Sequence, residues 1–252
     1  MRTTRIYVNT PLQLGLITLD AAAGQHLITV LRLKVGATVQ LFNHQHQEYL
    51  GQISQADKKK CVVQLTQSLP ILPASPLYTH LGLSLTKGDR MDFAIQKSVE
   101  LGVSEITPLL TQFTDVTLDA ERSIKKQTHW QKIALHACEQ CGRSDIPTIH
   151  PLTPFAQWIQ QPTAHTKLIL HPLAEKSNAA DKTHSTVADL LKNSTRINIG
   201  IGPEGGFHTN EITLAVAHDF HALSLGPRIL RSETAPVVVL SILQWLKGDL
   251  IR

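Results

Sequence analysis

The pattern of hydrophobic and polar positions changes along the chain at about residue 70. Before that point, short β-like runs predict strands, and one longer apolar run predicts a helix. The predicted strands cover 5–8, 37–43, 48–55 and 61–67, and the predicted helix covers 21–33. Short strands joined by polar turns in so small a segment favour a small β-barrel.

The segment 68–76, SLPILPASP, separates this part from the rest of the chain. Its three prolines predict a stiff, extended linker. Beyond it, apolar runs alternate with helical stretches, which predicts an α/β domain with a mostly parallel sheet covered by helices. The predicted strands there cover 79–85, 105–111, 166–172, 196–201 and 221–226. We therefore expect two domains, 1–73 and 74–252.

The composition is that of an ordinary folded protein, with 42% hydrophobic and 17% charged residues among 252. No apolar run approaches the roughly 20 residues that span a bilayer. The N-terminus lacks the apolar core of a signal peptide, so we expect a cytoplasmic protein without membrane contact.

Three cysteines in a chain of this length do not form a disulfide framework. Cys138 and Cys141 lie near the end of a predicted helix. His129 and His136 lie together on one side of this helix, and the two cysteines lie on another. Four converging ligands are therefore not available locally. We expect the two cysteines to have a packing role, and we expect no metal site.

The excess of positive charge is confined to the first domain. Residues 1–73 hold seven Lys/Arg against three Asp/Glu, a net charge of +4, and the remainder is neutral. This division favours a module that binds a polyanion, although Lys58–Lys60 also fits a solvated hairpin turn. On the helix predicted at 88–102, Lys87, Arg90 and Lys97 lie within roughly 80° of one another, so they either contact phosphates or form a solvated face.

A glycine-rich loop follows the strand predicted at 196–201. Its spacing, Gly200-x-Gly202-x-x-Gly205, matches the dinucleotide fingerprint, but the next helix begins only after Phe207. The next strand ends in glycine, proline and arginine instead of an acid, and no Walker A lysine is present. A glycine loop that lacks phosphate-binding residues suits the adenosine of S-adenosylmethionine, bound beyond the carboxyl ends of parallel strands.

Four motifs resemble one known family over nearly the whole chain. IGIGPEGGF, LSLGPRILRSETA, IQKSVELGV and ACEQCGR are similar to the RsmE-type bacterial small-subunit rRNA uridine-N3 methyltransferases of the SPOUT superfamily. The resemblance implies a deep trefoil knot in the C-terminal sheet, a PUA-like barrel that holds RNA, and a homodimer. One departure is His208, where the family usually has Ser or Thr, so we expect Thr209 to cap the next helix instead.

The resemblance further implies that S-adenosylmethionine supplies a methyl group to N3 of a uridine in 16S rRNA, either as naked RNA or within the assembled 30S subunit. Residues on the three strand-end loops are expected to bind the cofactor: Leu170, His171, Pro172, Gly200, Ile201, Gly202, Pro203, Glu204, Gly205, Leu225, Gly226, Leu230, Arg231, Thr234 and Ala235. Basic residues expected to contact RNA are Arg5, Arg32, Lys34, Lys87, Arg90, Lys97, Arg143 and Arg228.

Methylation at N3 spreads negative charge onto the uracil carbonyl oxygens, which Arg231 or Arg228 could stabilise with fixed N–H donors. Glu204 is the nearest candidate base, followed by Glu233, and solvent is the alternative acceptor of the proton. A strand-end histidine such as His171 more often braces a loop. Arg231 could also be structural, through a salt bridge to Glu204 or Glu233, and Ser232 or Thr234 could cap the last helix.

Two other functional classes are compatible with parts of the pattern. A non-catalytic RNA-binding or ribosome-assembly protein could keep the same fold, and failure to bind the cofactor would favour it. A nicotinamide-dependent dehydrogenase is the more remote alternative, because only the spacing of the glycines supports it.

Overall fold

The structure, a computed structural model, describes residues 3–57, 60–114, 119–171, 191–192 and 194–250. The chain forms two compact units. The first contains Met1–Ala74 together with Leu135–Ile146, and the second contains Ser75–Ala134 with Pro147–Arg252. The division near residue 74 lies close to the expected domain boundary, but Leu135–Ile146 belong to the first unit, although the sequence interpretation placed them in the second.

The first unit is built on a five-stranded sheet with strand order β1-β3-β4-β5-β2. Its strands are β1 (Thr4–Tyr7), β2 (Gly15–Thr18), β3 (Thr38–Phe42), β4 (Glu48–Asp57) and β5 (Lys60–Ser68). β1 pairs with β3 in parallel, and the other pairs are antiparallel. The prediction of a small β unit is confirmed, and β2 is the strand that was not predicted.

The helix of the first unit is shorter than predicted. Asp20 accepts a hydrogen bond from the backbone N–H of Ala23 at 2.8 Å and so caps α1 (Ala21–Gln25). A π-helical turn, η1 (His26–Val30), follows directly. Arg32 then adopts a positive φ of 54°, which no right-handed helix accommodates, so the helix cannot extend to residue 33 as predicted.

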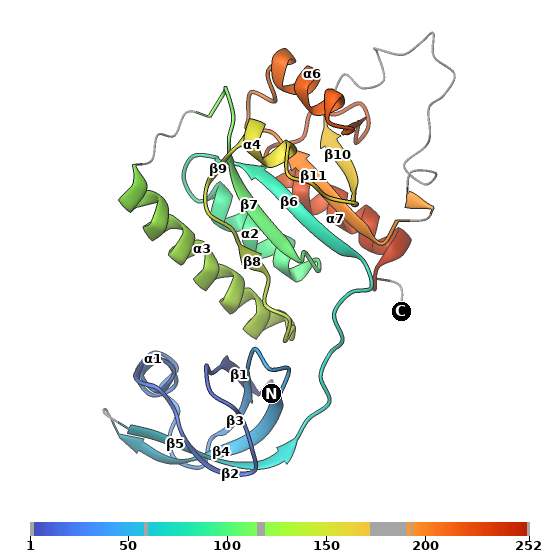
Figure 1. Cartoon of the computed structure of the whole chain (residues 1–252). Coiled ribbons are helices and arrows are strands. Elements are labelled where there is room, and N and C mark those ends of the chain that lie inside the picture. The colour runs from blue at the N-terminus through green and yellow to red at the C-terminus, as the bar shows by residue number, and fades with distance from the viewer. Residues whose placement is uncertain (1–2, 58–59, 115–118, 172–190, 193, 251–252) are drawn as a thin grey trace. The chain divides into compact units, whose positions relative to one another are not determined.

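A mostly parallel sheet forms the second unit, as predicted, with the strand order β12-β10-β11-β6-β7-β8 (Figure 1). Its strands are β6 (Tyr78–Ser84), β7 (Glu105–Leu110), β8 (Thr148–Ile149), β9 (Thr153–Pro154), β10 (Thr166–Leu170), β11 (Arg196–Ile201) and β12 (His221–Leu223). β9 pairs with β7 off this path. β8 and β9 are two residues long and were not predicted, because such short strands leave no periodic signal.

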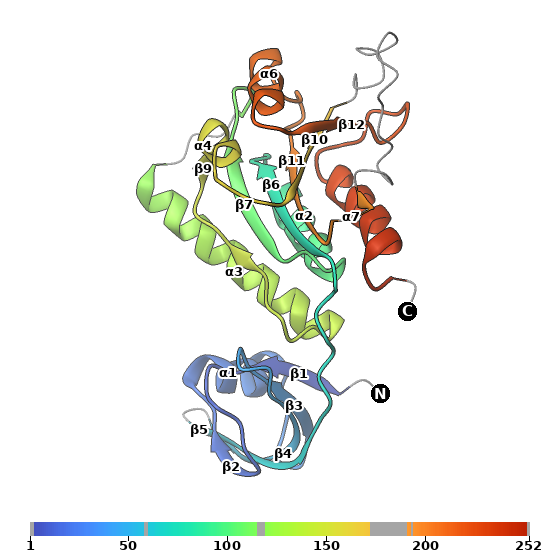
Figure 2. The same ribbon diagram turned by 45° about the vertical axis from the view of Figure 1, so that its right-hand side comes forward.

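Helices cover both faces of this sheet. They are α2 (Arg90–Glu100), α3 (Ala120–Cys141), α4 (Phe155–Ile159), α6 (Thr209–Ala217) and α7 (Thr234–Lys247). Figures 1 and 2 show α2 and α7 on the face opposite α4. Gly82 of β6 allows α4 to approach closely, because a β-carbon there would lie 2.7 Å from the ring of Trp158.

The N-terminus of α6 differs from the expectation that Thr209 caps it. His208 is the N-cap: its Nδ1 accepts from the backbone N–H of Asn210 at 3.1 Å, and the carboxylate of Glu211 accepts from the backbone N–H of His208 at 2.9 Å. An imidazole with a lone pair on Nδ1 thus completes the capping box that a Ser or Thr hydroxyl forms elsewhere. Thr209 is the first residue of the helix.

Residues 172–190, which belong to the connection from β10 to β11, lie outside the described part of the chain, so the trefoil knot stays a prediction. Among the described helices, none combines the length and the apolar character that crossing a membrane would require.

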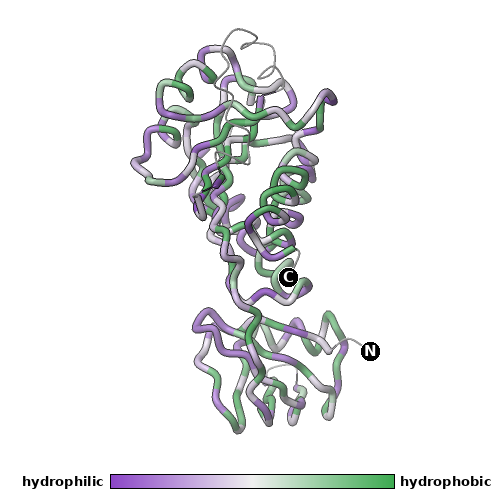
Figure 3. The backbone as a smooth tube through the Cα atoms, turned by 90° about the vertical axis from the view of Figure 1, so that its right-hand side faces the viewer, coloured by the Kyte–Doolittle hydropathy of each residue, from purple (hydrophilic) through white to green (hydrophobic). Residues whose placement is uncertain are grey.

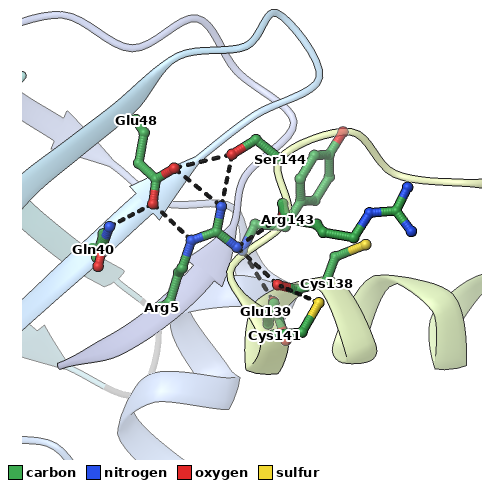
Figure 4. Close-up of polar contacts among 9 residues, drawn as sticks. Arg5, Gln40, Glu48, Cys138, Glu139, Cys141, Arg143 and Ser144 are labelled. Carbon is green, nitrogen blue, oxygen red and sulfur yellow. Dashed lines mark hydrogen bonds and ion pairs between the residues drawn. The ribbon is translucent and has the colours of Figure 1, made fainter. Parts of the chain in front are cut away.

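The first unit contains a buried ion pair (Figure 4). The guanidinium of Arg5 donates from Nε to one oxygen of Glu48 at 2.7 Å and from Nη2 to the other at 3.1 Å. Nη2 also donates to the hydroxyl of Ser144 at 2.8 Å, and Nη1 donates to the backbone carbonyls of Cys138 and Arg143. Only 7% of the Arg5 side chain and 4% of the Glu48 side chain are exposed. The pair therefore ties β1 to β4 and to the segment 138–144 within this unit.

Removal of the negative partner should leave the Arg5 guanidinium buried and uncompensated. We expect Glu48→Gln to lower the free energy of unfolding of the first unit by about 3–5 kcal/mol, measured by urea denaturation. The control is Glu121→Gln, which removes an exposed pair with Lys125 and should change the midpoint little. Equal midpoints for the two variants would contradict this account.

Candidate functional site

A pocket of about 300 Å³ lies where β10, β11 and β12 end. These strands are adjacent and parallel, so their carboxyl ends meet at the same edge of the sheet. The last residue of each strand, Leu170, Ile201 and Leu223, lines the pocket. The remaining walls come from the loops that follow the strands and from the start of α7. This is the edge at which open α/β sheets bind ligands.

Most of the residues expected to bind the cofactor line this pocket. They are Leu170, His171, Ile201, Gly202, Pro203, Glu204, Gly205, Leu225, Gly226, Leu230 and Ala235. Arg228, which was expected to contact RNA, lines it too. The lining is chiefly glycine and aliphatic, with few charged groups, and it offers no cluster of cations for a phosphate. It suits a flat, largely uncharged ligand group such as adenosine.

Three expected residues do not line the pocket. A β-carbon at Gly200 would face Ile169, Trp158 and Phe207 at 3.5–3.7 Å, so this glycine faces the core and not the ligand space. Thr234 is the first residue of α7, and Arg231 points outward with 82% of its side chain exposed. Pro172 lies outside the described residues.

Five lining residues were missed by the sequence interpretation: Gly206, Phe207, Leu223, Ile229 and Ser232. Each lies within two positions of a residue that was predicted, so the motifs themselves pointed to this part of the chain. Phe207 is buried and packs against Phe155 of α4, with the ring centroids 4.9 Å apart. An aromatic core residue therefore also forms part of the pocket wall.

The glycine loop is a tight turn whose glycines have different roles. Gly206 has a φ of +74°, in the left-handed region, and its N–H donates to the carbonyl of Pro203 at 2.9 Å. A β-carbon at Gly202 would lie 3.0 Å from the carbonyl carbon of Gly206, so the turn closes only on a bare backbone there. At Gly205 a β-carbon would make ordinary contact with Phe113, at 3.4 Å.

Glu204, the candidate base, is paired with a residue that was expected to bind RNA. One carboxylate oxygen lies 2.5 Å from Nη1 of Arg90, and both side chains are about half exposed. This ion pair occupies the carboxylate that would have to accept the uracil proton. Arg90 and Glu204 therefore fasten the N-terminus of α2 to the glycine loop.

Arg231 and Glu233 are only loosely associated. Nη1 of Arg231 lies 4.0 Å from a carboxylate oxygen of Glu233, and Ser232 donates to the same carboxylate at 3.2 Å. The expected helix cap is absent: Glu233 is the N-cap residue of α7, and neither Ser232 nor Thr234 makes the capping bond. The backbone N–H groups of Thr234 and Ala235 donate instead to the carbonyl of Arg231.

His171 lies at the pocket edge and braces the sheet. Its backbone N–H donates to the carbonyl of Leu223 at 3.0 Å, which links the ends of β10 and β12. Burial lowers the pKa of its imidazole, so the ring is neutral at pH 7.

Two of the basic residues expected to contact RNA are buried. Arg5 is held by Glu48, as described above, and Arg143 pairs with Asp145 at 2.6 Å with 9% of its side chain exposed. The prediction was wrong for both, because net charge in a sequence does not distinguish a buried ion pair from a surface cation. Arg32, Lys34, Lys87 and Arg228 are exposed, and Lys97 is half-buried and pairs with Glu100 at 2.7 Å.

Burial raises the pKa of the Cys138 thiol to about 12, so the thiol is protonated at pH 7. Its side chain is fully buried, and Sγ of Cys141 points back to the carbonyl of Cys138. A buried, neutral thiol of this kind supports the packing role.

Two protein-family models match the chain. An RNA methyltransferase domain matches residues 73–244, and an RNA methyltransferase PUA domain matches residues 19–66. Among curated relatives, the ribosomal RNA small subunit methyltransferase E of Buchnera aphidicola subsp. Acyrthosiphon pisum is 35% identical, over 97% of this chain and 94% of the relative. The protein of the same name from Bacillus subtilis is 29% identical, over 89% of each chain.

Solved structures agree with this assignment. A putative methyltransferase from Legionella pneumophila, in complex with S-adenosylmethionine, is 41% identical and has a TM-score of 0.90, covering 99% of this chain and 100% of that one. The ribosomal RNA small subunit methyltransferase E of Neisseria gonorrhoeae, also bound to S-adenosylmethionine, is 32% identical with a TM-score of 0.85 and the same coverage. The chain belongs to the RNA methyltransferase family, among the ribosomal RNA small subunit methyltransferases E.

Proposed function

We propose that this protein transfers the methyl group of S-adenosylmethionine to N3 of a uridine in small-subunit ribosomal RNA. The observation that carries the proposal is the pocket at the carboxyl ends of β10, β11 and β12, lined by bare backbone and aliphatic side chains. Two relatives that match nearly the full chain are solved with this cofactor. We also propose that the protein acts in the cytoplasm, which a ribosomal RNA substrate supports.

The residues present fit the cofactor. Three glycines of the loop 202–206 line the pocket without side chains, so a ligand can approach their backbone closely. Leu225, Leu230 and Ala235 offer apolar contact to an adenine ring. When bound, S-adenosylmethionine supplies an electrophilic methyl group that carries its own leaving group. The tasks left to the protein are positioning and charge stabilisation.

Arg228 and Arg231 are the candidates that stabilise charge on the uracil. Loss of the N3 proton leaves negative charge on two carbonyl oxygens, which the planar guanidinium can meet with two N–H groups. Arg228 lines the pocket, whereas Arg231 lies on the same loop and points outward, free to meet an incoming base. Because Glu204 is engaged by Arg90, solvent is the better acceptor of the proton.

RNA binding is assigned to the first unit and to the exposed cations of the second. The match of residues 19–66 to an RNA methyltransferase PUA domain supports this role. Arg32 and Lys34 are exposed on the first unit, and Lys87 is exposed before α2. Contacts between these cations and phosphates predict that affinity for RNA falls as salt is added.

A direct test is methylation of ribosomes from cells that lack the protein. Purified protein and radiolabelled S-adenosylmethionine should label 16S rRNA, and the label should map to N3 of a uridine. Parallel reactions with naked rRNA and with 30S subunits identify the preferred substrate. Binding of RNA without any methyl transfer would instead favour a ribosome-assembly protein.

We further propose that the protein is a homodimer. Ile242, Trp245 and Leu246 of α7 are exposed, as is Leu250 beyond it, and Figure 3 colours the helix beside the C-terminus largely as hydrophobic. Apolar side chains gathered on one helix are typical of a surface that a second copy covers.

The dimer predicts a sedimentation mass of about twice the 27.8 kDa of the chain. Trp245→Glu should shift the protein toward the monomer, because it places a charge in the apolar contact. The matched control is Ile124→Glu, at an exposed apolar position of α3. A wild-type protein that is monomeric at every concentration would overturn the proposal.

The glycine loop predicts a specific loss of cofactor binding. Gly206→Val forces a β-branched residue into the left-handed region, which costs on the order of 1–3 kcal/mol and should weaken S-adenosylmethionine binding roughly 10- to 100-fold in calorimetry. Gly205→Ala is the control, since its β-carbon makes ordinary contact with Phe113, and it should bind within a few-fold of wild type. Equal affinities for both variants would show that the loop has no part in binding.

Substitution of the two arginines should have different effects on turnover and on cofactor affinity. Arg231→Lys should lower turnover by roughly 10²–10³, because lysine lacks the planar guanidinium, and should leave cofactor affinity unchanged, because Arg231 does not line the pocket. Arg228→Lys should lower both the turnover and the cofactor affinity. Melting temperature checks that each variant is folded. Wild-type turnover in Arg231→Lys would exclude it as a catalytic residue.

A further inference from the structure

A cluster of side chains that could ligate a metal lies where β6 and β7 start, at the end of the second sheet opposite the pocket. His80 stands near the start of β6, Glu105 begins β7, and His150 directly follows β8. His80 and Glu105 are paired in register, and β6, β7 and β8 are neighbours in the sheet (Figure 1). Ligand atoms of all three residues lie within 4.8 Å of one another.

The three ligand atoms lie close together. Nε2 of His150 lies 2.7 Å from Oε2 of Glu105, and Nδ1 of His80 lies 3.8 Å from the same oxygen. The two imidazole ring centroids are 5.3 Å apart. Two nitrogens and a carboxylate oxygen at these separations need small side-chain shifts to reach a common ion at the 2.0–2.2 Å typical of zinc.

The orientation of the His80 ring is fixed by contacts on the side away from Glu105. Its Nε2 is hydrogen-bonded to the hydroxyl of Thr107 at 2.7 Å, and the ring packs edge-on against Trp158. This leaves Nδ1 directed to Glu105 at a distance too long for a hydrogen bond. In protein metal sites, a ligating histidine almost always has its second nitrogen held in this way.

We propose that His80, Glu105 and His150 form a zinc site. Two imidazoles and one carboxylate are ligands that zinc prefers, whereas magnesium and calcium select oxygen atoms alone. Glu105 and His150 are about one-third exposed, so water can occupy a fourth position. The ion joins the start of β6 and β7 to the segment after β8, far from the strand ends that form the pocket. This inference does not depend on the proposed methyl transfer.

A neighbouring histidine on the same face is engaged differently. Nδ1 of His165 bonds the side-chain oxygen of Asn198 at 2.7 Å, and its Nε2 accepts from Arg196 at 2.8 Å. Both ring nitrogens are therefore committed to protein partners. His165 thus provides a matched control for a metal ligand.

Calorimetric titration of the metal-free full-length protein with zinc chloride at pH 7 tests the proposal. We expect one zinc per chain and an increase in melting temperature with zinc. Glu105→Gln and His150→Asn should each abolish this binding, while His165→Asn should keep it. Unchanged S-adenosylmethionine affinity and circular dichroism verify that the variants are folded.

A second variant acts without removing a ligand. Thr107→Val deletes the hydrogen bond that orients His80 and should weaken zinc binding roughly 10- to 100-fold. His136→Asn tests the rival location in the first unit, where His136 stacks on His26, and should leave binding unchanged. Absence of a stoichiometric zinc in the wild type, or its retention in His150→Asn, would overturn the proposal.

Discussion

Parallel pairing of β10 with both β11 and β12 is the constraint on which the pocket depends. The registers align Leu170 with Leu223 and Ile169 with Gly200, so the three strands end at nearly the same level. Each chain segment must then turn away over the same edge. The pocket walls are consequently loops, and in the described residues no strand of the sheet pairs with the glycine loop 202–206. The position of the ligand site is therefore set by the direction of the strands, whichever side chains line it.

Aromatic packing holds the glycine loop at its base. Trp158 of α4 lies over the sheet where Gly82 has no side chain, and Phe155 of the same helix packs on Phe207 at the end of the loop. The same cluster includes Ile169, which precedes the pocket residue at the end of β10. The turn is therefore held rigid by the hydrophobic core directly beneath it. A substitution in that core would change the shape of the pocket.

Much of the fold was predictable because buried strands and long helices have strong periodic signals. Strands β6, β7, β10 and β11 of the second sheet were predicted to within two residues at each end, and the motifs located most of the pocket. β2, β8 and β9 were missed because short or half-exposed strands have no such signal. The cap at His208 was missed because propensity rules favour hydroxyls, although a neutral imidazole offers an equivalent acceptor.

Interactions between residues distant in sequence account for the remaining errors. From the sequence, Arg5 is indistinguishable from a surface cation. The structure places it beside Glu48, which is 43 residues away in the sequence. Arg90 and Glu204 are 114 residues apart, and neither motif indicates that they pair. His80, Glu105 and His150 are scattered over 70 positions and match no metal-binding spacing, so only the sheet register brings them together. The expectation of no metal site rested on local spacing alone.

The order of strands in the sheet has a consequence for folding during synthesis. Among the described strands, β10 pairs only with β11 and β12, both of which are made later. At about 5–20 residues per second, the roughly 30 residues up to the end of β11 take a few seconds to emerge from the ribosome. Throughout that interval the apolar segment Thr166–Leu170 has no partner and remains open to chaperones or to aggregation. The sheet of this RNA methyltransferase is thus complete only after the ribosome has made β11 and β12.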